Sequence, residues 1–212
     1  MRNSLWPLML AVAAGCAANH AGPSRQPVPN PYINRPMITP ALAGQKVAVL
    51  PVILVVADPE MSADTLVGVR SKILPWSDSL LGEALQGRAP EVTWVGPAEL
   101  RRDAYRSGGL VGDPDHFAHP ILRDTMVKIV PDPLRSQIRA LVALADARFV
   151  LAPAAEVFKR DSTGVKIELY LVLADARTGQ AGWRSIATAT AATPAQAFRA
   201  AMAHVLPIAG VQ

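Results

Sequence analysis

A strict alternation of apolar residues near the carboxyl end restricts the fold of this chain more than any other feature. Every second residue from 165 to 173 is a large aliphatic one, namely Val165, Ile167, Leu169, Leu171 and Leu173. Because the side chains of a strand point alternately to its two faces, these residues predict a strand with one buried face. The turn sequence DARTG at 175–179 joins it to a second strand at 181–191, which indicates a β-hairpin.

Strands and helices alternate in the preceding residues. We expect strands at 46–56, 91–95 and 149–158, and helices at 77–87, 97–106, 133–145 and 194–205. Ser77 is the expected N-cap of the first helix, and Pro51 is expected to interrupt the first strand. The glycines and prolines of 107–131 predict a loop. The pattern indicates an α/β or α+β domain, with one small mixed sheet covered by helices and a hairpin and helix at its carboxyl end.

The amino terminus, MRNSLWPLMLAVAAGC, has the layout of a secretory signal peptide at residues 1–15. Its apolar run is too short to span a bilayer. The residues that end in Cys16 resemble the lipobox of bacterial lipoproteins, in which the cysteine receives lipid and the preceding peptide is removed. Ala13 stands where leucine is usual, so cleavage as an ordinary signal peptide is the alternative. Cys16 is the only cysteine of the chain and therefore cannot form an intramolecular disulfide.

Residues 16–45 are expected to form a proline-rich tether that holds a domain at 46–212 away from the membrane. The alternative is that the part from Tyr32 to Ile38 packs against the domain. Half of the residues are hydrophobic and 18% are charged, which predicts a sizeable core. The net charge of +4 is spread along the chain without a Lys/Arg run, which argues against nucleic acid as a partner.

Three segments resemble a known group of proteins: VAVLP, LADARFVLAPAAEV and DARTGQAGWR. They are similar to periplasmic lipoproteins whose domain resembles the amino-terminal domain of TolB. That group includes the curli secretion lipoprotein, lipoprotein activators of penicillin-binding proteins and a lipoprotein of exopolysaccharide export. The resemblance covers Lys46 to Leu206 and depends most on Asp175, Thr178, Gly179 and Trp183. It implies a fold like that of the TolB amino-terminal domain and says little about activity; residues 108–131 depart from it.

One cluster contains residue types that bind metals: Asp113, Asp115, His116 and His119. Zinc sites use three or four such ligands. The chain has no H-E-x-x-H helix, and no thiolate joins the cluster, so we expect a solvated surface loop without a metal. The motifs G-x-S-x-G, S-x-x-K and G-x-x-x-x-G-K-[ST] are absent from the sequence. We therefore expect no catalytic residues and no cofactor.

Tyr170 and Trp183 are expected to lie near each other across the hairpin. Such an aromatic pair ordinarily stabilises a sheet, and an exposed aromatic side chain also anchors binding partners. The pair is thus the candidate partner surface. Lys166 and Glu168 are expected to be solvated charges, and Trp76 and Trp94 are expected in the core.

These features favour a non-catalytic envelope lipoprotein, anchored to a membrane through lipid on Cys16 and binding a protein partner. That partner would act in envelope assembly, secretion or cell-wall synthesis. Ala17 follows the cysteine, and the absence of Asp there favours the outer membrane, facing the periplasm, over the inner membrane. A module that binds a small ligand or a polysaccharide is the first alternative. A hydrolase or metalloenzyme is the second.

Overall fold

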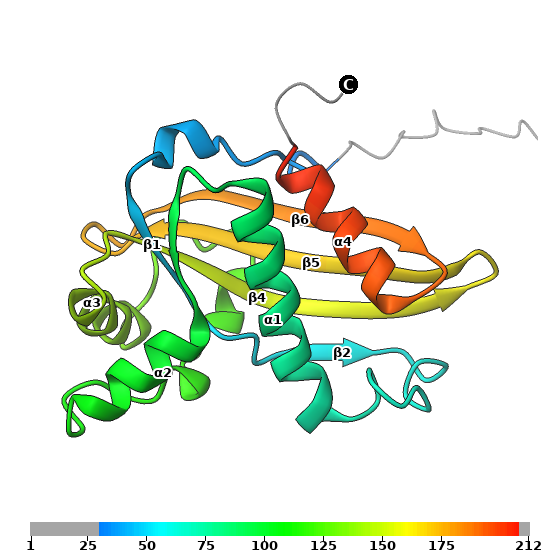
Figure 1. The fold of residues 1–212 in the computed structure, drawn as a ribbon, viewed down its shortest axis with the longest axis horizontal. Coiled ribbons are helices and arrows are strands. Elements are labelled where there is room, and N and C mark those ends of the chain that lie inside the picture. The colour runs from blue at the N-terminus through cyan, green and yellow to red at the C-terminus, as the bar shows by residue number, and fades with distance from the viewer. Residues whose placement is uncertain (1–29, 208–212) are drawn as a thin grey trace, which may run out of the picture. The chain divides into compact units, whose positions relative to one another are not determined.

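The computed structural model describes residues 30–207, which form a mixed α/β domain (Figure 1). Its strands are β1 (Lys46–Val49), β2 (Val55–Ala57), β3 (Thr93–Val95), β4 (Phe149–Asp161), β5 (Gly164–Asp175) and β6 (Ala181–Ala191). Its α-helices are α1 (Arg70–Arg88), α2 (Pro97–Arg106), α3 (Leu134–Leu144) and α4 (Pro194–Val205). Within the described residues the sheet has six strands in the order β3-β1-β4-β5-β6, and β2 also pairs with β4. The predicted fold class is confirmed.

The first predicted strand is divided in two. β1 pairs in parallel with residues 149–151 of β4, and β2 pairs in parallel with residues 156–158 of the same strand. Pro51 lies between them and has no backbone N–H to donate to a neighbouring strand. The predicted interruption at Pro51 is therefore confirmed, and residues 51–54 form a break between β1 and β2.

The predicted hairpin is also confirmed, as the antiparallel pair β5–β6. In its turn, the N–H of Gly179 donates to the carbonyl of Asp175 at 2.7 Å. Gly179 has φ +77°, and a Cβ placed there would lie 2.8 Å from Nε of Arg135. The conformation of the turn therefore favours glycine, and a larger residue would also have to displace the side chain of Arg135.

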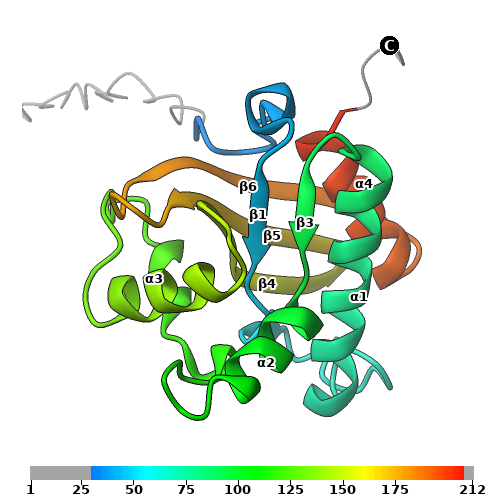
Figure 2. The ribbon, with the colours of Figure 1, turned by 60° about the vertical axis from the view of Figure 1, so that its left-hand side comes forward.

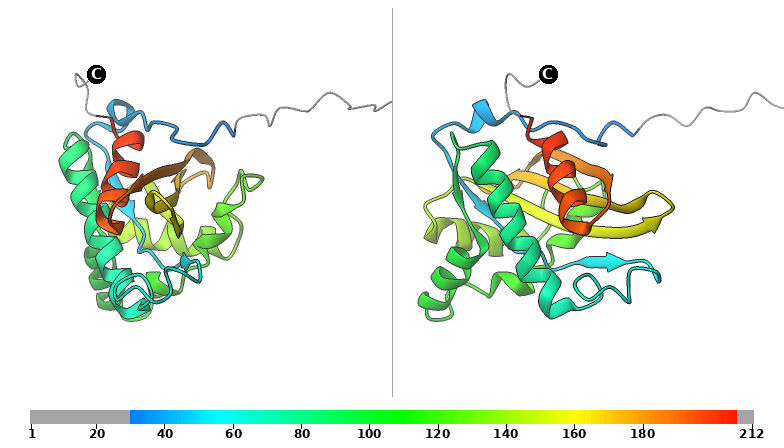
Figure 3. Two further views of the ribbon diagram at one scale, coloured as in Figure 1. Left: turned by 90° about the vertical axis from the view of Figure 1, so that its right-hand side faces the viewer. Right: turned by 45° about the vertical axis from the view of Figure 1, so that its right-hand side comes forward.

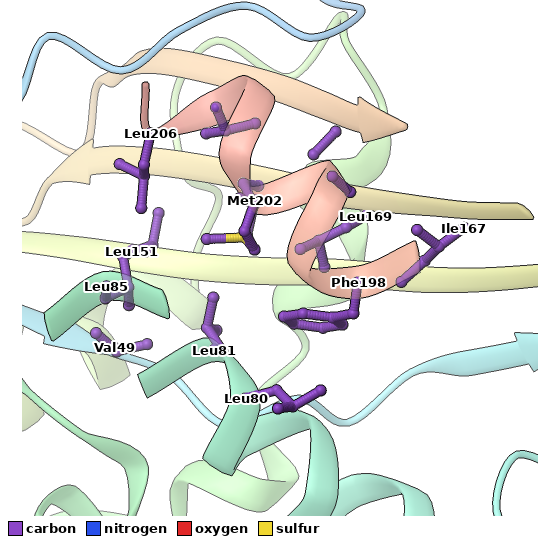
Figure 4. Close-up of a cluster of buried hydrophobic side chains, with 14 of the residues drawn as sticks. Val49, Leu80, Leu81, Leu85, Leu151, Ile167, Leu169, Phe198, Met202 and Leu206 are labelled. Atoms are coloured by element: carbon purple, nitrogen blue, oxygen red, sulfur yellow. The ribbon is translucent and has the colours of Figure 1, made fainter. Parts of the chain in front are cut away.

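Helices α1 and α4 cover one face of the sheet (Figures 1 and 4). Side chains of β5 and both helices form the core on this side, and those that are fully buried include Ile167, Leu169, Leu171, Leu81, Leu85, Phe198 and Met202. The predicted burial of the apolar face of β5 under the last helix is confirmed. Trp76 packs at the edge of this core, 6.0 Å from the ring of Phe198.

Helices α2 and α3 cover part of the other face (Figure 2), together with the short 3-10 helices η2 (Pro114–His116) and η3 (His119–Arg123). This second core buries Leu100, Phe117, Leu122, Ile138 and Leu141 against Val150, Ala152 and Val172. The predicted loop at 107–131 contains no α-helix or strand, but the expectation that its cluster at 113–119 is a solvated surface loop is wrong in part, because Phe117 and His119 are buried. Short 3-10 turns bury some of their apolar side chains, and such turns leave no regular period in the sequence.

Arg184 of β6 holds the same segment against the sheet. Its guanidinium is almost buried and donates to the backbone carbonyls of Leu122, Asp124 and Val127. Three carbonyls on one cation fix the path of this segment, because a buried guanidinium left without acceptors would be costly.

The first helix begins earlier than expected. Ser77 is not its N-cap, because α1 starts at Arg70 and includes Pro75. A proline inside a helix removes a hydrogen bond, so the sequence favoured a start after Pro75. Ser77 is instead buried in the middle of the helix and donates to the carboxyl of Glu156 on β4 at 2.6 Å.

Residues 31–45, which we assigned to the tether, pack against the domain. The indole of Trp183 donates to the carbonyl of Pro36 at 2.9 Å, and the N–H of Met37 donates to that of Val205 at 2.8 Å. The structure thus has the alternative arrangement, and residues 31–38 are called the strap below. The signal peptide, Cys16 and the tether up to residue 29 lie outside the described residues. Between residues 30 and 207, no helix is long and apolar enough to cross a membrane.

Candidate functional site

The break between β1 and β2 exposes backbone groups that side chains from distant elements satisfy. Nε2 of His119 donates to the carbonyl of Pro51 at 3.0 Å. The guanidinium of Arg70, at the start of α1, donates to the carbonyl of Ile53 at 2.9 Å. Buried backbone groups need such partners, so the break recruits polar residues into an otherwise apolar region.

The metal candidates do not converge. His119 is fully buried, and its Nδ1 has no hydrogen-bond partner among the described residues. Burial lowers the pKa of His119 to about 4, so the ring is neutral at neutral pH. His116 is exposed and lies 3.2 Å from Asp113. Within residues 30–207 no group of three or more His, Cys, Asp or Glu side chains is placed to hold a metal.

Arg101 of α2 connects two carboxylates beside the break. Asp78 accepts from the N–H of Val52 at 2.8 Å and from the guanidinium of Arg101 at 2.8 Å. The same guanidinium makes a bidentate pair with Asp115, with both distances at 2.7 Å. The hydrogen bond with Asp115 contributes most to raising the pKa of Arg101, whereas burial raises the pKa of Asp78. Arg101 is therefore a fixed cation.

Glu156 is a fully buried carboxyl on β4, facing α1. Its Oε2 accepts from Ser77, and its Oε1 has no hydrogen-bond partner in the described part of the chain. Burial raises the pKa of Glu156 to about 8, against the opposing effect of the hydrogen bond from Ser77. Sequence reasoning missed this residue, although a glutamate inside the apolar strand LAPAAEV was a signal for it.

Two cavities open on either side of Arg101 and Asp115. The larger, of about 870 Å³, is lined by residues of the break and of the first turns of α1, including Ile53, Val69, Ser71 and Leu74. The smaller, of about 530 Å³, is lined by the end of α2 and the following turn, including Tyr105, Gly109 and Val111. Arg101 and Asp115 line both cavities and so form a shared wall. We call the two cavities together the cleft.

Large apolar side chains project from the cleft into solvent. Tyr105 lines the smaller cavity, and Leu110 lies in the turn beside it; each is 88% exposed. Exposed tyrosines at the rim of a cavity are suited to anchor a partner, because tyrosine is enriched among the residues that dominate binding energy at interfaces. The cleft is therefore the candidate functional site, although the sequence alone did not identify it.

The expected pair of Tyr170 and Trp183 does not form. Trp183 lies opposite Leu173 and Tyr170 opposite Ile186, so the two aromatic side chains point to opposite faces of the sheet. Trp183 is only 8% exposed and packs in the core beneath α1 and α4. Tyr170 is half-buried on the other face. The pair therefore cannot form one partner surface, because an odd register offset separates its members.

Among the comparisons with known proteins, the one with solved structures finds similar folds. No protein-family model matches the chain, and no curated protein sequence does either. The fold is similar to the LpoB C-terminal domain from Salmonella enterica, with 16% identity, a TM-score of 0.41 and coverage of 70% of this chain and 84% of that one. It is similar to lipoprotein GNA1162 from Neisseria meningitidis, with 14% identity, a TM-score of 0.34 and coverage of 70% and 81%.

A third similar structure is a PelC dodecamer from Paraburkholderia phytofirmans, with 13% identity, a TM-score of 0.36 and coverage of 77% of this chain and 87% of that one. At identities of 13–16%, these similarities concern the fold alone.

Proposed function

We propose that this chain is a lipoprotein of the bacterial cell envelope, anchored in the outer membrane by lipid on Cys16, whose domain binds another envelope protein without catalysing a reaction. One observation carries the partner-binding role: Tyr105 and Leu110, each 88% exposed, stand at the cleft. The anchor is supported by the sequence around Cys16.

The shape and chemistry of the cleft suit a protein segment. Two cavities divided by the pair of Arg101 and Asp115 offer separate places for two side chains of one partner. Tyrosine and arginine are enriched among the residues that dominate binding energy at protein interfaces. Tyr105 and Arg101 are one helical turn apart on α2 and line the same cavity.

The polar cluster behind the cleft supports a structural role for its titratable groups. Ser77 and Glu156 form a nucleophile–carboxyl pair in sequence terms, but both are fully buried, so a substrate would not reach the hydroxyl. Arg101 is engaged by two carboxylates. These groups fix the break between β1 and β2, and this favours a binding protein over an enzyme.

Photo-crosslinking in living cells tests the partner role. With a photoreactive amino acid at position 105 or 110, we expect a crosslink to one defined envelope protein. The Tyr105→Ser/Leu110→Ser variant should weaken that complex at least tenfold, because exposed anchors of this size carry on the order of 2 kcal/mol each. Leu144 of α3, which is 44% exposed, provides the control site. An equal crosslink from position 144, or an unaffected complex in the variant, would refute the proposal.

Mass spectrometry of the mature amino terminus tests the anchor. A chain that begins at Cys16 and carries added acyl mass is expected from wild type, and Cys16→Ser should abolish both the acyl mass and membrane retention. Several buried acyl chains make anchoring close to permanent, since each CH₂ contributes about 0.8 kcal/mol. An unmodified amino terminus at another residue would contradict the lipid anchor.

The larger cavity also favours the alternative role, a module that binds a small ligand or a saccharide. Its volume of about 870 Å³ is in the range of small-molecule sites. One variant distinguishes the binding of a small ligand from the binding of a protein partner. Ser71→Trp places an indole into that cavity and would abolish binding of a ligand there, while the crosslink from position 105 would persist.

A further inference from the structure

The strap and the segment 124–130 lie together along the outer edge of β6. The carbonyl of Tyr32 accepts from the N–H of Ile186 at 2.8 Å, and that of Lys128 accepts from the N–H of Ala181 at 2.9 Å. The ammonium of Lys128 lies 3.2 Å from the hydroxyl of Tyr32, which links the two segments. Figure 3 shows the strap in blue along this edge of the sheet.

Both segments expose apolar side chains along this edge, and each also carries an exposed cation. Ile33 is 51% exposed, Met126 78% and Ile129 61%. The neighbouring Arg35 and Lys128 are also exposed. Together these five residues are called the strap patch. Its large side chains contribute nothing to either core, so the fold does not explain their apolar character.

The strap patch lies close in sequence to the expected lipid anchor. The segment 17–30 separates Cys16 from the strap, and even fully extended it reaches at most about 50 Å. A short tether keeps the patch at a high local concentration at the membrane surface, which adds to the patch's own affinity for that surface. Bacterial envelope membranes offer anionic headgroups, which attract exposed Lys and Arg, while apolar side chains insert at the headgroup boundary.

We propose that the strap patch docks on the anionic lipid surface to which the chain is anchored, an inference that rests on the proposed lipid anchor. The contact would hold the edge of β6 toward the bilayer. In Figure 2 the strap and α2 lie at opposite ends of the domain, so Tyr105 and Leu110 would remain accessible to a partner. Lipidation would then set an orientation as well as a location.

Vesicle binding tests this inference without the acyl chains. The unlipidated chain of residues 16–212 with Cys16→Ser contains the whole described domain. We expect it to bind vesicles of phosphatidylglycerol mixed with phosphatidylcholine, and to bind pure phosphatidylcholine at least tenfold more weakly. Arg35→Gln/Lys128→Gln should reduce binding to the anionic vesicles by roughly tenfold or more. Met126→Ser/Ile129→Ser should reduce it by a similar factor.

Tyr105→Ser/Leu110→Ser is the control, because it removes two large side chains, each 88% exposed, from the cleft. Thermal unfolding of each variant verifies that the domain is intact. The inference stands if both patch variants lose binding and the control retains it. It is overturned if the parent chain ignores anionic vesicles, if either patch variant binds like the parent, or if the control loses as much. The mass of the Cys16 terminus decides the anchor separately.

Discussion

Leu169→Ala is expected to lower the free energy of unfolding by about 2–5 kcal/mol, the usual range for truncating a buried leucine. Leu169 is fully buried at the centre of β5, between Glu156 of β4 and Ala187 of β6. Helix α4 covers it, as Figure 4 shows. The cavity left by the truncation would be bounded by a sheet and a helix, which collapse poorly, so we expect a loss within the upper half of that range.

Lys166→Ala is the matched control on the same strand. Its side chain is 41% exposed on the opposite face and lies 3.3 Å from Glu168. Exposed ion pairs of this kind contribute little, so the free energy of unfolding should change by about half a kcal/mol or less. Denaturant titration of the unlipidated chain measures both variants. A neutral Leu169→Ala with a severe Lys166→Ala would mean that the two faces of β5 are exchanged.

The parts of the fold that the sequence predicted well are those with strong local signals. The alternation in 165–173 fixes which face of β5 is buried, and Gly179 fixes the turn. The last helix starts as predicted because Thr193 caps it, accepting from the N–H of Gln196, with Pro194 following. In each case a few adjacent residues determine the geometry, so no knowledge of distant contacts was needed.

The elements that the sequence predicted incorrectly depend on contacts between residues far apart in the chain. α1 extends through Pro75, and Ser77 finds its acceptor on β4, 79 residues away. Residues 107–131 are ordered by short turns and by Arg184, which follows them by more than fifty residues. Local propensity carries no information about such partners, and tertiary packing overrides it.

The candidate site could not be predicted from the sequence for the same reason. Asp78, Arg101 and Asp115 come from three elements and meet because Pro51 breaks the first strand beside them. The sequence predicts the interruption at Pro51, but it does not indicate which distant residues supply the polar partners that the break needs. A charged residue within a buried strand, such as Glu156, is a sequence signal for a polar cluster of this kind.

Glu156→Gln is expected to make the domain more stable relative to wild type as the pH rises. The pKa of Glu156 is about 8 in the folded protein, against 4.5 for the unperturbed group. Below pH 4.5 the carboxyl is protonated in both states and costs nothing. Between pH 4.5 and 8 the unfolded state loses its proton first, so wild type loses stability as the pH rises, and the loss is complete above pH 8. Glutamine does not ionise and escapes this loss.

The free energy of unfolding of the variant, minus that of wild type, should therefore increase by on the order of 3 kcal/mol between pH 5 and pH 8. Near pH 5 the variant should be slightly less stable, because its buried amide N–H groups find few acceptors beside Ser77. His119 has a folded pKa of about 4, below its usual 6.5, so its contribution to stability is lost as the pH falls. That effect is present in both proteins and cancels in the difference.

Glu168→Gln is the control for this measurement. Burial raises the pKa of Glu168, but its ion pairs with Lys159 and Lys166 outweigh burial and hold that pKa below the usual value. Its removal should give a difference that does not increase between pH 5 and pH 8. If the difference in the free energy of unfolding between Glu156→Gln and wild type is also constant from pH 5 to pH 8, the carboxyl of Glu156 has its ordinary pKa in the folded protein. Water would then reach the carboxyl of Glu156, and the region between α1 and β4 would be more open than its full burial indicates.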